Sequence, residues 1–236
     1  MAPVGRELGH TLGVVEPLQN ADSLGGQINE LIEQLTAHAD LPVTLIGSSW
    51  GAILALFTAA RQPGLARKLI LIGCAVFDAA SSASIEDRRL ERLSPDERKR
   101  FEAISEQLKN ARSDEAAEIA RQWGDIFLNT DVYDPLTTDL ETIEVQCERH
   151  TKVWADFVAL RDTPGNLAAE FSRITQPTVV IHGDSDPHPI KGIRPFLQSC
   201  ISDVRFYMLD RCGHYPWIER HARARFFEIL RSEISR

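Results

Sequence analysis

The chain has 236 residues, of which 43% are hydrophobic and 25% charged, as in a globular domain that buries its own core. The formal net charge is −8, and no basic run with interleaved aromatic residues occurs, which argues against nucleic-acid binding. No apolar run reaches the roughly 20 residues that span a bilayer, and the first residues lack a secretory pattern. We therefore expect a cytoplasmic protein that does not act at membranes.

The four cysteines are far apart and form no CxxC pair. Such spacing is typical of free or buried thiols in a reducing compartment. The residues concerned are Cys74, Cys147, Cys200 and Cys212.

Short apolar runs alternate with helical patterns along most of the chain. Residues 13–18 (GVVEPL) predict a short buried strand, and residues 26–38 carry apolar side chains at helical spacing. Buried strands that alternate with helices are typical of a parallel sheet with helices on both faces, so we predict an α/β fold. Further strands are predicted at 42–47 (PVTLIG), 68–73 (KLILIG), 176–183 (QPTVVIHG) and 203–210 (DVRFYMLD), and a last helix at about 221–234.

The middle of the chain, residues 76–174, shows helical patterns and no convincing strand. Ser94, Pro95 and Glu97 fit a capping box, and Phe101, Ile104 and Leu108 follow at helical spacing. We predict a helical insertion at 76–174 between the two parts of an α/β core, residues 1–75 and 175–236. A later helical face, which we interpret as core-facing rather than cofactor-binding, carries Cys147, His150, Trp154 and Phe157, and a turn is predicted at 163–166 (TPGN).

The sequence GSSWG at residues 47–51 lies between a predicted strand and a predicted helix. A sharp strand-to-helix turn exposes one side chain on a rigid backbone, and small residues two positions away on either side avoid collisions. This pattern makes Ser49 a candidate nucleophile and the amide of Trp50, at the helix start, a candidate oxyanion donor. A plain glycine and serine turn is the structural alternative.

A serine nucleophile needs a base and a carboxylate that orients it. The HGDSDP run at 182–187 follows one predicted strand and offers Asp184 and Asp186, and the GHYPWIE run at 213–219 follows the next and offers His214. Because these strand ends meet at one edge of a parallel sheet, the three groups are candidates for a single site.

These three motifs resemble those of α/β-hydrolases, of the lidded kind that includes proline iminopeptidases and esterases. The resemblance covers about residues 6–235 and favours Asp186 as the acid, with Asp184 less favoured and Asp78 third. It implies a serine hydrolase that cleaves a small ester or amide bond through an acyl-enzyme, with His214 as base, Asp186 orienting it, the Trp50 amide in the oxyanion hole and residues 76–174 as lid. The implied partner is a small-molecule substrate.

The chain departs from the family pattern at its N-terminal side. No His-Gly-rich loop supplies a second oxyanion donor, and the first three strands of the fold are missing from the sequence. We therefore expect an N-terminally truncated α/β-hydrolase. A catalytically inert binding protein with the same fold is the alternative function.

The alternation of His182, Asp184, Asp186 and His188 contains metal-ligand residue types. Gly183 and Pro187 bend this segment, so the four side chains are not expected to share a strand face. We predict no metal and no cofactor. His182 is expected to pack beside the sheet, whereas His188 fits either a pocket mouth or an exposed position equally well.

Overall fold

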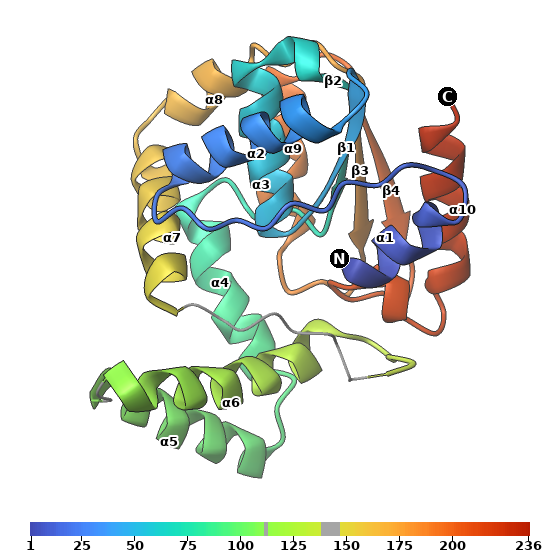
Figure 1. Cartoon of the computed structure of the whole chain (residues 1–236). Helices are drawn as coiled ribbons and strands as arrows, with labels where there is room; N and C mark the ends of the chain where they lie inside the picture. The colour runs from blue at the N-terminus through green and yellow to red at the C-terminus, as the bar shows by residue number, and fades with distance from the viewer. Residues whose placement is uncertain (111–112, 138–146) are drawn as a thin grey trace.

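The computed structural model describes residues 1–110, 113–137 and 147–236. Its centre is a parallel sheet in the order β1-β2-β3-β4, formed by β1 (Val43–Ser48), β2 (Ala66–Ile72), β3 (Thr178–Gly183) and β4 (Val204–Leu209) (Figure 1). The four later predicted strands are thus confirmed. The register pairs Ser48 with Ile72 and Gly183 with Leu209, so the turns after these strands gather at one edge of the sheet.

Helices cover both faces of the sheet, as predicted (Figure 1). Alternate residues of β2 serve the two layers: Leu69 and Leu71 belong to one apolar cluster, and Ile70 and Ile72 to the other. Successive side chains of a strand point to opposite faces, which explains why this strand is apolar throughout. The first cluster includes side chains from α2 (Leu24–His38), α3 (Trp50–Arg61) and α9 (Arg194–Cys200), and the second from α1 (Ala2–Gly9) and α10 (Arg223–Ile234).

The segment between β2 and β3 is helical in its described parts. The α5 (Pro95–Asn110) and α6 (Ser113–Asp131) helices pack on each other around Phe101 and Phe127, away from the sheet (Figure 1). By contrast, α7 (Cys147–Asp162) and α8 (Asn166–Phe171) bury Phe157 and Phe171 in the main core. The remaining elements are α4 (Ala79–Leu90) and the short 3-10 helices η1 (Pro63–Leu65), η2 (Ile190–Gly192) and η3 (Pro216–Ile218). The limits 76–174 for a lid stay a prediction.

Local signals in this segment have their expected structures. The Ser94 amide donates to Glu97 Oε2 at 2.8 Å, and the Glu97 amide donates to Ser94 Oγ at 3.3 Å, which confirms the capping box. The predicted turn contains Gly165 with a φ of 82°. The side chains of Leu108 and Cys147 lie outside the described residues, and Cys74, Cys200 and Cys212 are free thiols.

The predicted strand at 13–18 is wrong. These residues form no regular element, and Val14 and Leu18 are 44% and 62% exposed. A strand needs a neighbour for its backbone N–H and C=O groups. Among the described strands, β1 lies at the edge of the sheet and pairs with β2 alone. Glu16 and Pro17 also limit the apolar run to a few residues. Among the described helices, none is both long and apolar enough to cross a bilayer.

Candidate active site

Ser49 occupies a strained turn between β1 and α3. Its φ of 51° and ψ of −115° lie outside the regions that most residues adopt, and its amide donates to the Ile72 carbonyl at 3.0 Å. A Cβ on Gly47 would lie 2.2 Å from the Gly51 carbonyl oxygen, so position 47 requires glycine. A Cβ on Gly51 would have nothing within 4 Å, so the expected collision at 51 does not occur.

Trp50 begins α3, and the amide of a first helical residue has no intrahelical acceptor. The indole N–H donates to Gln27 Oε1 at 2.8 Å, and the ring packs against Trp154 and Phe157 with centroids 6.1 and 6.0 Å apart. These contacts attach the strained turn to α2 and α7. The amide predicted to bind an oxyanion is therefore on a fixed backbone.

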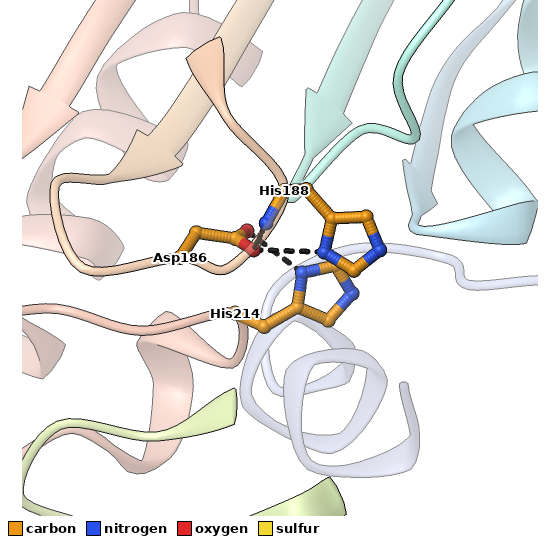
Figure 2. A group of neighbouring side chains, drawn as sticks. All are labelled: Asp186, His188 and His214. Carbon is orange, nitrogen blue, oxygen red and sulfur yellow. Dashed lines mark hydrogen bonds and ion pairs between the residues drawn. The ribbon is translucent and has the colours of Figure 1, made fainter. Parts of the chain in front are cut away.

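Asp186 and His214 come together from the turns that follow β3 and β4 (Figure 2). His214 Nδ1 lies 2.7 Å from Asp186 Oδ2, and the two side chains are 2% and 0% exposed. Because an ionised carboxylate only accepts, Nδ1 must carry the proton. Nε2 of a neutral His214 is then free to accept one, as a general base requires.

His188 is a second imidazole on the same carboxylate (Figure 2). Its amide and its Nδ1 lie 2.8 and 2.9 Å from Asp186 Oδ1, and its ring stacks on that of His214 with centroids 4.5 Å apart and planes inclined by 26°. The side chain is 12% exposed, so of the two positions considered from sequence His188 does not take the exposed one. No sequence signal distinguished that outcome.

Burial and neighbouring charges shift these groups in different directions. Burial raises the pKa of Asp186, but the charge of His214 and hydrogen bonds from both imidazoles hold it well below the usual value. Burial lowers the pKa of His214, but the charge of Asp186 and its hydrogen bond raise the pKa above 6.5. Burial and the charge of His214 lower the pKa of His188 below 6.5. At neutral pH, Asp186 is charged and His188 is neutral.

Ser49 and His214 flank the end of β2. The Ser49 amide bonds to Ile72, and a Cβ on the next residue, Gly73, would lie 2.9 Å from His214 Nδ1. The serine turn is thus bonded to Ile72, and the imidazole lies beside the next residue, Gly73, at the same edge of the sheet. Within the described residues, the Ser49 hydroxyl makes no hydrogen bond to His214.

The other carboxylates considered from sequence lie elsewhere. Asp184 is exposed and accepts from the Cys212 amide at 3.2 Å, whereas Asp78 caps α4 through the Ser81 amide at 2.7 Å. His182 is buried, as expected; its Nε2 donates to the His188 carbonyl at 2.9 Å, and its Nδ1 has no hydrogen-bond partner.

Asp186, His188 and His214 have residue types that bind metals, and their facing atoms lie within 4.8 Å of one another. Both imidazole Nδ1 atoms are already engaged with the carboxylate, at 2.7 and 2.9 Å. Hydrogen bonding accounts for this arrangement, so we assign no metal to it.

Two buried carboxylates around the site were not identified from sequence. Glu219 is fully buried and accepts amide hydrogen bonds from Tyr133, Asp134 and Gly213 at 2.7, 2.8 and 2.7 Å. It thus joins the histidine turn to the segment after α6. In the sequence, the one sign of a buried role for Glu219 is its place as a charged residue directly after the apolar run PWI.

Asp131, the last residue of α6, is the other. Its side chain receives Arg89 through Nε at 2.7 Å and Nη2 at 2.6 Å, and its carbonyl accepts from the His214 amide at 2.6 Å. Arg92 donates to the Thr130 and Ser185 carbonyls, both at 2.5 Å. The helical segment is therefore bonded to both the acid turn and the histidine turn.

Two of the cavities lined by described residues lie close to α3. The larger, of about 250 Å³, lies between α3, α7 and α8 and is lined partly by Phe57, Leu160 and Glu170. The smaller, of about 70 Å³, is lined partly by Trp50 and Trp154, next to the Ser49 turn. Neither is lined by His214.

A family model described as the alpha/beta hydrolase family matches residues 8–228. The chain belongs to this family. No curated protein sequence matches it. Membership of the family, together with the paired acid and histidine at the sheet edge, supports a hydrolytic function.

Solved hydrolase structures share the fold. An esterase from Exiguobacterium antarcticum is 21% identical, with a TM-score of 0.61 over 95% of this chain and 78% of its own. Proline iminopeptidase from Mycobacterium smegmatis is 18% identical, with a TM-score of 0.57 over 94% and 76%. A 2-hydroxy-6-oxo-6-phenylhexa-2,4-dienoate hydrolase from Rhodococcus sp. strain RHA1 is 18% identical, with a TM-score of 0.57 over 93% and 75%. At these identities the likeness concerns the architecture.

Proposed function

We propose that the protein is a serine hydrolase that cleaves a small ester or amide bond through an acyl-enzyme intermediate. The observation that carries the proposal is the buried Asp186–His214 hydrogen bond at the sheet edge that also holds the strained Ser49 turn. Ser49 is the nucleophile, His214 the base and Asp186 the group that fixes the base.

In the first half-reaction, Nε2 of His214 takes the hydroxyl proton as Ser49 Oγ attacks the substrate carbonyl. The imidazolium then protonates the leaving group, and the acyl group remains on Ser49. In the second half-reaction, His214 takes a proton from water, whose oxygen attacks the acyl carbonyl. The imidazolium returns this proton to Ser49 Oγ as the bond between the acyl carbon and Oγ breaks, which releases the acid and restores the free enzyme. The Trp50 amide stabilises the negative oxygen in both steps.

The buried Asp186 performs two tasks in this scheme. Its hydrogen bond keeps the proton on Nδ1, which leaves Nε2 able to accept one, and its charge stabilises the imidazolium that forms during the reaction. The raised pKa of His214 reflects the same stabilisation of the imidazolium by the charge of Asp186. The α5–α6 pair is proposed as part of a lid that selects substrates.

A fluorophosphonate probe tests the nucleophile directly. We expect covalent labelling of the wild-type protein at Ser49, complete loss in Ser49→Ala and retention in Ser48→Ala, which alters the adjacent serine. Hydrolysis of p-nitrophenyl acetate should follow the same order. If folded protein is not labelled, the alternative of an inert binding protein is favoured. If Ser49→Ala is labelled as strongly as the wild type, Ser49 is not the nucleophile and the proposal fails.

A further inference from the structure

A buried carboxylate with two imidazole donors is the least expected feature of the site (Figure 2). One oxygen of Asp186 accepts from His214, and the other accepts from the amide and the ring of His188. We propose that His188 is a positioning residue for the reaction, which fixes Asp186 and, by sharing its charge, weakens its stabilisation of the His214 imidazolium. This inference rests on the proposed function.

The physical reason lies in how a carboxylate stabilises a cation. Each N–H that donates to Asp186 stabilises its negative charge locally and leaves less of it for His214. His188 supplies two such donors at 2.8 and 2.9 Å, against one from His214 at 2.7 Å. A substitution of His188 removes the Nδ1–H donor and leaves the backbone amide donor in place.

Stacking of the two rings restricts their charge states. With centroids 4.5 Å apart, two imidazolium ions would repel each other in a poorly solvated site. The pair therefore holds one extra proton at most, and in the reaction this proton belongs to His214. His188 stays neutral, with its Nδ1–H directed at Asp186.

His182 holds His188 in this geometry. Its Nε2 donates to the His188 carbonyl at 2.9 Å, and its buried Nδ1 lies 3.8 Å from Asp186 Oδ2. Burial lowers the pKa of His182, so it adds no positive charge to the cluster at neutral pH. The other ionisable groups near the carboxylate or the imidazoles are Cys74, Arg89, Arg92, Asp131, Asp184, Cys212, Tyr215 and Glu219.

The sign of the effect follows from these contacts. Removing the side-chain donor leaves more charge on Asp186 for His214, so the pKa of His214 should rise further above 6.5. The proton then stays on His214 up to a higher pH, and the acidic limb of kcat/KM moves upward. A side chain that merely fills space would change kcat without moving this limb.

Two variants separate donation from the presence of an imidazole. His188→Ala removes the Nδ1–H donor, and we expect the pKa of His214 to rise by about 0.5–1 unit. His188→Asn places an amide N–H where Nδ1 lies but has no titrating ring. In this variant the pKa of His214 should stay at its wild-type value. His38→Asn, at an exposed histidine in the last turn of α2, is the matched control.

The pKa of His214 is best read by NMR titration in a Ser49→Ala background, with the signal assigned by its loss in His214→Gln. This readout does not require catalysis, so failure of the proposed function and failure of this inference give different results. An unchanged pKa in His188→Ala overturns the inference. Equal shifts in His188→Ala and His188→Asn also overturn it, because they would assign the effect to the ring rather than to its donor.

Discussion

Glu219→Gln tests whether one buried carboxylate holds the histidine turn in place. In Glu219, Oε1 accepts from the Tyr133 and Gly213 amides, and Oε2 accepts from the Asp134 amide. Glutamine can replace only one of these oxygens, and its NH₂ group would face an amide that also donates. One buried N–H therefore loses its partner, and the other two bonds lose the charge that strengthens them.

The magnitude follows from these three bonds. A buried donor without an acceptor costs about 1–3 kcal/mol, and hydrogen bonds to charged acceptors exceed neutral ones by roughly 1 kcal/mol. With one unpaired donor and two weakened bonds, we expect the free energy of unfolding of Glu219→Gln to fall by about 3–5 kcal/mol. Because Gly213 precedes His214, activity should fall as well, even at temperatures where the variant stays folded.

Urea unfolding followed by circular dichroism measures this loss. Glu228→Gln is the control, since this glutamate of α10 has a side chain that is 67% exposed and pairs with Arg225 at the surface. Its unfolding free energy should change by less than about 0.5 kcal/mol. If Glu219→Gln is no less stable than Glu228→Gln, the three amides have other partners and the reasoning fails.

Two further predictions concern the serine turn and the base. Gly47→Ala should lower the free energy of unfolding by about 1–3 kcal/mol, because the new Cβ meets backbone atoms at 2.2 Å. Gly51→Ala, which adds a Cβ in open space on α3, should raise it by up to about 1 kcal/mol; equal losses in urea unfolding would contradict this contrast. The proposed mechanism requires neutral His214, whose pKa is raised, so kcat/KM should fall as the pH drops through a value above 6.5. An acidic limb below pH 6.5 would contradict that assignment.

The sheet could be predicted because buried parallel strands appear as continuous apolar runs. The β2 and β3 strands supply side chains to both faces, and each of these runs ends in a glycine. The same criterion failed at residues 13–18, where an apolar run has no strand beside it. Composition identifies a segment that can form a strand, whereas hydrogen bonding requires a neighbour that composition does not supply.

The site could be predicted only as far as strand ends determine it. Turns after β3 and β4 had to meet at one edge, and the structure places Asp186 and His214 within hydrogen-bond distance there. The second imidazole and the buried Glu219 depend on how each turn folds back, for which periodicity carries no information. Only Pro187 separates Asp186 from His188, and the backbone at this point directs the ring of His188 to the carboxylate of Asp186.

Attachment of the α5–α6 pair at its base limits how that pair can move. Arg92, just before α5, and Asp131, at the end of α6, are both bonded to the turns that carry the acid and the histidine. A rigid swing about this base would pull the imidazole away from its carboxylate. In the proposed lid, bending at the far end of the two helices, rather than a swing of the whole pair, would leave the hydrogen bond between His214 and Asp186 intact.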